Sequence, residues 1–373
     1  MTALARDFGP IEFPDQFQGL FARARSRYEP IIHRARSSLR SLPVPSHFAP
    51  YFRYGVLEHP QPSFVLAPLM FLAVAEDQGG ISPRHERYLP AFLLMVELIG
   101  VLDDTVDYTP LRSGRRTYWH RFGAPSAAPF SGFLLSAAVE QTMGAAPELL
   151  PLVTRMFREV GAAETWEHGA RYPAANPGAL ATWLEHHYAA VPAAISHSLD
   201  GALLLHGHEP LPPQVCVRFA QLQQDVDDIV NLVERREQAG ENDDLKMGVV
   251  TFPLLAAVRH DPRAAQWLDD LWRTGRRPDD GSPELPPAAL PLTAPQHPAL
   301  RALVLSHGVP ATLDKIAHDA AAAIAATQPP MKNCMADLVW TFVERLCRIE
   351  SLRREVERRC PAVMTVRGDG EGG

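Results

Sequence analysis

Three aspartates at the end of an apolar stretch are the first residues whose type and spacing could do chemistry. They are Asp103, Asp104 and Asp107, in the run LDDTVD. Because about four residues make one helical turn, Asp103 and Asp107 should point from the same face of a helix. Carboxylates crowded on a buried helix need a cation between them, and Mg²⁺ prefers such oxygen ligands. The alternative is an acidic helix end that is exposed to solvent.

A second group of oxygen ligands lies on another predicted helix. Gln224, Asp227 and Asn231 follow the spacing of one helical stripe, and Asp228 flanks that stripe. Two carboxylate-bearing helices that face each other across a bundle can form a metal site. Farther along the chain, Lys246 could supply a cation to a phosphate bound at this site. Its alternative role is that of a solvated lysine in a loop.

The elements that must position these residues are helices. Apolar residues recur at helical spacing and alternating strand patterns are scarce, so the chain is predicted to be all-α. Helices are expected over residues 15–40, 65–78, 85–108, 127–142, 148–160, 178–206, 213–238, 250–259, 310–327 and 332–358. No domain boundary is evident, so residues 1–366 are predicted to form a single domain. Within it, 275–298 is expected to be a proline-rich loop, and 367–373 a disordered tail.

The composition excludes several classes of function. The chain has 373 residues, of which 46% are hydrophobic and 21% charged, and its formal charge is −7. This acidic balance, without any basic run, argues against a nucleic-acid partner. No apolar run is long enough to span a membrane, the N-terminal residues do not resemble a signal peptide, and the cysteines fit no zinc spacing. We therefore expect a cytoplasmic protein.

The order and spacing of the motifs resemble those of trans-isoprenyl diphosphate synthases. Residues 102–123 look like the first aspartate-rich motif of that family, 224–231 like the second, and 244–253 like the segment that follows it. The resemblance implies the isoprenoid synthase helical bundle with a central active-site cavity. It also implies a site for Mg²⁺, with three ions, and an allylic prenyl diphosphate as the substrate.

The resemblance assigns a role to each candidate residue. It makes the aspartates of both motifs catalytic metal ligands, with Asn231 as a further ligand: Asp103, Asp104, Asp107, Asp227 and Asp228. The substrate diphosphate would be bound by Arg112, Lys246 and Gln224. On the helix before Asp103, Leu98 and Ile99 would form an apolar wall with no aromatic plug, which leaves room for a farnesyl or geranylgeranyl chain.

Two departures from the family pattern concern the second substrate. Family members carry basic residues at the position of 62–68 that bind isopentenyl diphosphate, and here the run is PSFVLAP. Ser113 also stands where family members have an arginine that binds isopentenyl diphosphate. Arg112, which matches the arginine that binds the allylic diphosphate, is retained. A diphosphate without its Lys and Arg partners is poorly compensated. The losses therefore predict that isopentenyl diphosphate is not used.

The main interpretation is thus a class I terpene synthase or prenyltransferase of divergent sequence. It would ionise an allylic diphosphate, release diphosphate, and quench the carbocation by cyclisation or by transfer to a different acceptor. One alternative is a chain-elongating polyprenyl diphosphate synthase that uses isopentenyl diphosphate. A second alternative is a non-catalytic subunit that binds a prenyl chain or partners an active synthase.

Two further expectations concern assembly and stability. Synthases of this fold are usually homodimers, and residues 127–139, in the helix after the first motif, carry no charge, so a homodimer is expected. Replacing Asp103 or Asp104 by alanine should abolish turnover. Because it removes like charges from one helix end, the same change should leave stability unchanged or slightly higher.

Overall fold

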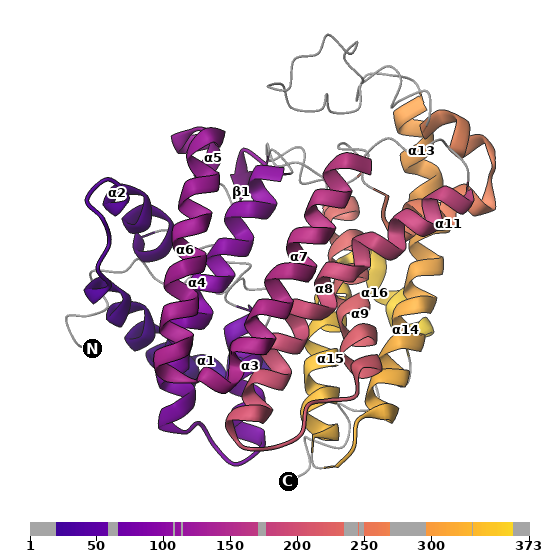
Figure 1. The fold of residues 1–373 in the computed structure, drawn as a ribbon. Helices are drawn as coiled ribbons and strands as arrows, with labels where there is room; N and C mark the ends of the chain where they lie inside the picture. The colour runs from indigo at the N-terminus through magenta and orange to yellow at the C-terminus, as the bar shows by residue number, and fades with distance from the viewer. Residues whose placement is uncertain are drawn as a thin grey trace.

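The computed structural model describes residues 20–58, 66–106, 109–112, 115–170, 177–234, 245, 250–268, 296–329 and 331–360. Within these ranges the chain is almost entirely helical (Figure 1). The exception is a small antiparallel hairpin of β1 (Leu111–Arg112) and β2 (Arg115–Arg116). The predicted all-α fold is confirmed.

The helices of the N-terminal half are α1 (Leu20–Ser38), η2 (Leu39–Ser41), α2 (Ala49–Phe52), η3 (Arg53–Glu58), α3 (Leu66–Asp77), α4 (Pro83–Val106), α5 (Tyr118–Phe122), α6 (Ala124–Ala145), η5 (Pro147–Leu149) and α7 (Leu150–Ala170). Those of the C-terminal half are α8 (Pro177–Leu205), α9 (Pro213–Glu234), α11 (Phe252–His260), α13 (Gln296–Leu303), η7 (Val304–Gly308), α14 (Val309–Ala326), α15 (Lys332–Cys347) and α16 (Glu350–Arg359). None of them is both long enough and apolar enough to span a membrane.

The long helices run up and down beside one another. In Figure 1, α4 and α6 stand on the left and α9, α14 and α15 on the right, with α7 and α8 between them. The packing agrees with this view: α4 packs against α6, α8 against α7 and α9, and α14 against α9. The loop before α9 reverses the chain, so α4 and α9 run toward the same end of the bundle. That end carries β1 and α11, the elements that follow them.

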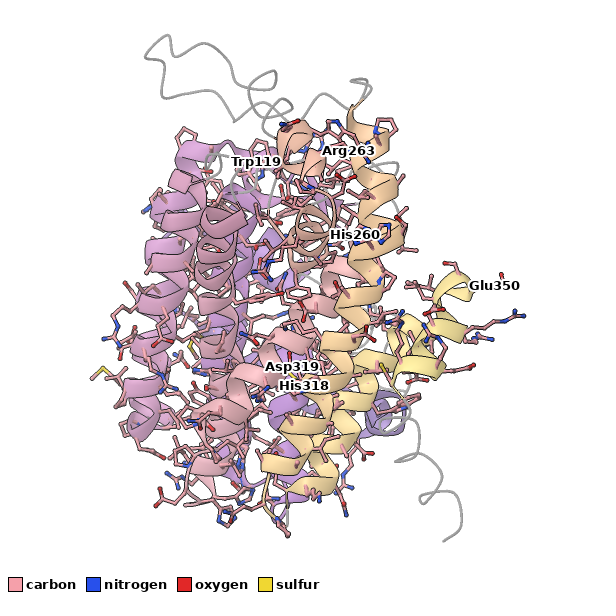
Figure 2. The ribbon with its side chains drawn as sticks, turned by 90° about the vertical axis from the view of Figure 1, so that its right-hand side faces the viewer. Trp119, His260, Arg263, His318, Asp319 and Glu350 are labelled. Carbon is pink, nitrogen blue, oxygen red and sulfur yellow. The ribbon has the colours of Figure 1, made fainter. Side chains whose placement is uncertain are left out.

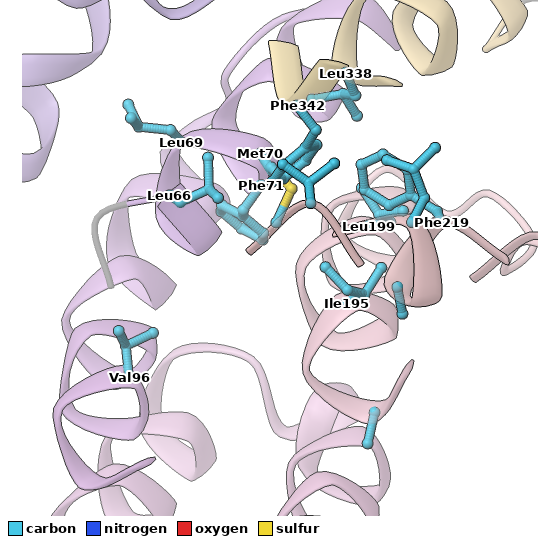
Figure 3. Close-up of a cluster of buried hydrophobic side chains, with 14 of the residues drawn as sticks. Leu66, Leu69, Met70, Phe71, Val96, Ile195, Leu199, Phe219, Leu338 and Phe342 are labelled. Atoms are coloured by element: carbon cyan, nitrogen blue, oxygen red, sulfur yellow. The ribbon is translucent and has the colours of Figure 1, made fainter. Parts of the chain in front are cut away.

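The core forms because α3 and α4 are apolar on nearly every face, which is the pattern of a helix surrounded by others. Figure 3 shows Met70 and Phe71 of α3 close to Leu199 of α8, with Phe219 of α9 and Phe342 of α15 beside them. The Phe219 and Phe342 rings meet edge to face with their centroids 5.4 Å apart. All five side chains are buried. This cluster joins α3, the helix before the one that carries the first acidic motif, to α9, which carries the second.

A close backbone contact fixes the start of α11. Gly308, in η7, lies so near the first turn of α11 that a Cβ atom there would be 2.1 Å from the Pro253 carbonyl oxygen. Any side chain at this position would push the two elements apart. The glycine therefore allows α11 to pack closely against η7.

Several predicted elements differ from the observed ones. The helix predicted over 332–358 is two helices, because Ile349 takes an extended conformation between α15 and α16. The loop predicted at 275–298 ends earlier, since α13 already begins at Gln296. The rest of that loop and the tail 367–373 lie outside the described residues. The hairpin and the short helices α2 and α5 were not predicted, because such short elements carry too little periodicity.

Candidate active site

The first acidic cluster is the last turn of α4 together with the hairpin that follows it. Asp104 is completely buried, whereas the Asp103 side chain is 34% exposed. Arg112, on β1, donates from Nε to Asp104 Oδ1 at 2.6 Å and pairs with Asp103 through Nη2. The guanidinium is therefore the cation that these two carboxylates require. We call Asp103, Asp104 and Arg112 the α4 cluster.

The hairpin that carries Arg112 is fixed to its neighbours by hydrogen bonds to backbone carbonyls. The Tyr54 hydroxyl donates to the Arg116 carbonyl at 2.7 Å. Thr117 Oγ1 donates to the Thr109 carbonyl at 2.6 Å, and Trp119 Nε1 donates to the same oxygen at 2.9 Å. In Figure 2, Trp119 lies near the end of the bundle that carries the site. These bonds hold the hairpin over the end of α4 and so position Arg112.

The second acidic cluster lies on α9. Gln224 Nε2 donates to Asp228 Oδ1 at 2.8 Å, one helical turn along, and Asp228 is buried. Asp227 is partly exposed and pairs with Arg345 of α15, a residue that sequence reasoning missed. The Asn231 Oδ1 atom is shielded from solvent and accepts no hydrogen bond from the part of the chain that the structure describes. We call Gln224, Asp227, Asp228 and Asn231 the α9 cluster.

A buried charge network anchors α9 beneath this cluster. Lys315, on α14, donates to Asp225 Oδ2 at 2.6 Å and to Asp319 Oδ2 at 2.9 Å. The Tyr188 hydroxyl of α8 donates to Asp225, and Arg218 Nη1 donates to Asp319 at 3.0 Å. Burial raises the pKa of Asp225 to about 6, although Lys315 opposes the shift. The network ties α8, α9 and α14 together, and Figure 2 places Asp319 farther down the bundle than Trp119.

The remaining predicted site residues are placed as follows. Leu98 is buried and Ile99 is half-buried, both on α4 below Asp103 and both packed in the hydrophobic core. Asp107 and Lys246 lie outside the described residues. The α4 and α9 clusters lie toward the same end of the bundle. Their roles as ligands stay predictions.

The donor atoms present fit a hard divalent cation. Both clusters offer oxygen ligands, and the shielded Asn231 Oδ1 is an acceptor that a cation would satisfy. Among the described residues, no three His, Cys, Asp or Glu side chains are grouped closely enough to hold an ion by themselves. The residues therefore fit ions that take part of their coordination from phosphate and water, as Mg²⁺ usually does.

Comparison with known proteins agrees with this fold. The sequence model of the polyprenyl synthetase family matches residues 82–282, more than half of the chain. The chain is similar to a polyprenyl synthase from Caulobacter crescentus in complex with calcium and isoprenyl diphosphate (TM-score 0.68, 19% identity, covering 88% of this chain and 98% of that one). It is also similar to a decaprenyl diphosphate synthase from Rhodobacter capsulatus (TM-score 0.66, 17% identity, 87% and 98%). No curated protein matches it in sequence.

The chain therefore belongs to the polyprenyl synthetase family. Members of this family are enzymes that transfer prenyl groups and use divalent metal ions. The resemblance read from the two aspartate-rich motifs is confirmed. The narrower interpretation as a terpene synthase is not confirmed, and the chain-elongating alternative fits the comparisons better.

Proposed function

We propose that the protein is a chain-elongating prenyl diphosphate synthase, which condenses an allylic prenyl diphosphate with isopentenyl diphosphate. The family match across both aspartate-rich motifs is the observation that carries this proposal. The α4 and α9 clusters support it, because both lie toward one end of the bundle and both offer oxygen ligands for metal ions that could bind a diphosphate.

The residues of the site suit the cleavage of an allylic carbon–oxygen bond. The leaving diphosphate gains negative charge as this bond breaks, so cations at its oxygens stabilise the transition state more than the ground state. Bound Mg²⁺ would supply most of this effect, since a dication and a unit charge about 4 Å apart attract by about 8 kcal/mol at an effective dielectric of 20. Asp103, Asp104, Asp107, Asp227, Asp228 and Asn231 would hold three such ions.

The chain's own cations and apolar side chains would complete the reaction environment. Arg112 and Lys246 would bind the oxygens of the allylic diphosphate, and Gln224 would keep Asp228 oriented through its 2.8 Å hydrogen bond. On α4, Leu98 and Ile99 would border the prenyl chain and exclude water from the allylic cation. Each of these roles awaits test by substitution.

The acceptor diphosphate needs cations that the run 62–68 does not supply. We propose that Arg115 and Arg116, on β2, take this role. Arg115 is paired directly with Arg112 across the hairpin, and Arg116 follows it on β2, so both lie in the hairpin that carries Arg112. If so, Arg115→Gln will raise the KM for isopentenyl diphosphate several-fold and leave the KM for the allylic substrate nearly unchanged.

A second candidate function remains because of one specific observation. The absence of basic residues in 62–68, together with Ser113, favours an enzyme that quenches the allylic cation by cyclisation or with another acceptor. Incubation with Mg²⁺ and geranyl, farnesyl or geranylgeranyl diphosphate, with and without isopentenyl diphosphate, separates the two. Elongation requires both substrates, whereas the second function consumes the allylic substrate alone.

We further propose that the enzyme is a cytoplasmic homodimer. On α6, Leu135 and Met143 are large apolar side chains, 38% and 60% exposed, on a helix whose first acidic residue is Glu140. Such a face suits an isologous interface. The four cysteines are free thiols, three of them buried, which suits a reducing compartment. Light scattering at micromolar concentration tests the dimer, and Leu135→Glu should shift it toward the monomer.

A further inference from the structure

An arginine of the C-terminal part of the chain contacts the α9 cluster. Arg345 lies on α15, which packs along α9, and its side chain is only 5% exposed. Its Nη1 atom donates a hydrogen bond to Asp227 Oδ1. The two residues are 118 positions apart in the sequence, so only the packing of α15 against α9 brings the cation to this carboxylate. In Figure 1 the two helices stand side by side.

The contact changes the charge available to a metal ion. Asp227 and Asp228 carry the charge of the cluster, since Gln224 and Asn231 are neutral. A guanidinium on Asp227 offsets one of these two charges and occupies an oxygen that a divalent cation would need. Burial also favours this contact, because separating a desolvated guanidinium from a carboxylate costs free energy. Arg345 and an incoming cation therefore contend for the same carboxylate.

On the basis of the proposed function, we propose that Arg345 is the resident counter-cation of the α9 cluster. It holds Asp227 in the metal-free enzyme and weakens divalent-cation binding there. A substrate diphosphate brings negative charge that compensates both the Arg345 guanidinium and the divalent ion. The α9 cluster therefore binds metal tightly only when the substrate is present. Arg345 is thus a positioning residue, which acts through Asp227.

The test is a titration of the full-length protein with Mn²⁺, in the absence of substrate, followed by the spectroscopic signal of free Mn²⁺. All variants carry Asp103→Asn, Asp104→Asn and Asp107→Asn, so that the remaining binding reports on the α9 cluster. Arg345→Met keeps the aliphatic packing of the side chain and removes its charge. We expect it to bind Mn²⁺ about tenfold more tightly than the parent, because a unit charge next to the metal ligand is gone. Arg345→Gln, a second neutral variant in case one fails to fold, should behave alike.

Three controls separate this role from a merely structural one. Arg345→Lys restores the charge and should bring the affinity back to the parent value. Arg348→Gln, just past the end of the same helix, removes an arginine that pairs with Glu344 at 3.3 Å and should change nothing. In an Asp227→Asn background, Arg345→Met should no longer tighten binding. Circular dichroism confirms that each variant is folded.

The outcomes distinguish the inference from the function on which it rests. Equal or weaker Mn²⁺ binding by folded Arg345→Met and Arg345→Gln overturns the role of Arg345, while a metal-dependent prenyl transfer would still stand. If no variant binds Mn²⁺, and neither does the chain with all its aspartates even after an allylic diphosphate is added, the metal site of the proposed function fails and the inference fails with it.

Discussion

Arg112 donates from Nε to Asp104 Oδ1 at 2.6 Å, so the guanidinium of the hairpin closes over the last turn of α4. The same side chain also pairs with Asp103. One arginine thus compensates two adjacent carboxylates, and the fork shape of the guanidinium makes this possible. This contact links the hairpin, which was not predicted from the sequence, to the first aspartate-rich motif, which was.

Replacing Arg112 by lysine tests the importance of that fork. Lysine keeps the positive charge but cannot donate to both carboxylates in a fixed plane. Because a charge-assisted hydrogen bond contributes about 1.5–3 kcal/mol, we expect kcat/KM for the allylic substrate to fall about 10- to 100-fold. Arg121→Lys is the matched control, since that guanidinium lies over the Tyr54 ring, 4.0 Å from its centroid. Wild-type kinetics for Arg112→Lys would contradict a role for the Arg112 guanidinium in the active site.

The two aspartates of the α4 cluster should differ in their effect on stability. Sequence reasoning predicted that alanine at either position leaves stability unchanged or slightly higher. The structure changes this expectation for Asp104, which is buried and bonded to Arg112. Asp104→Ala should lower the free energy of unfolding by about 1–3 kcal/mol, whereas Asp103→Ala should change it by less than about 1 kcal/mol.

Both substitutions should abolish turnover, and so should an excess of chelator. Urea denaturation gives the two stabilities, and an assay of diphosphate release gives the activity. Equal stabilities for the two alanine variants would contradict the burial of Asp104, and activity in the presence of chelator would contradict the metal requirement.

The network beneath the α9 cluster should matter for folding more than for chemistry. Lys315→Met leaves the buried Asp225 without its ammonium partner. Breaking a buried ion pair by removing one partner costs about 3–5 kcal/mol, and the free energy of unfolding should fall by that amount. Adding Asp225→Asn should recover part of the loss. Lys332→Met, an exposed lysine of α15, is the control and should change stability by less than about 0.5 kcal/mol.

Stability should also depend on pH through a histidine in the core. Complete burial lowers the pKa of His197 from 6.5 to about 3, and the Tyr88 hydroxyl lies 2.6 Å from its Nε2 atom. Below pH 6.5 the unfolded chain therefore binds a proton that the folded chain does not, and stability falls as the pH falls.

Between pH 7 and pH 5 this single group should cost about 2 kcal/mol of unfolding free energy. The measurement is denaturant unfolding at both values for the wild type and for His197→Gln, which should lack this part of the pH dependence. His208→Gln, at an exposed position, should retain it. An identical pH dependence in wild type and His197→Gln would contradict the neutral, buried state of the imidazole.

The parts of the site that sequence analysis found are those whose residues lie within one helix. The stripe of Gln224, Asp227 and Asn231 carries a helical period, so its face could be predicted, whereas the apolar run of α4 indicated only a buried helix. Arg345 could not be found in this way, because tertiary packing alone connects it to Asp227. The role of Asp225 was missed for the same reason: its partners come from two other helices.

The question left open by the sequence is the acceptor, and one measurement addresses it most directly. The protein is incubated with Mg²⁺, an allylic diphosphate and isotopically labelled isopentenyl diphosphate, and the products are separated by chain length. Chain elongation predicts that the label enters a longer prenyl diphosphate and that diphosphate release requires both substrates. If diphosphate is released from the allylic substrate while all of the label stays in isopentenyl diphosphate, the enzyme does not elongate prenyl chains and the proposed function is wrong.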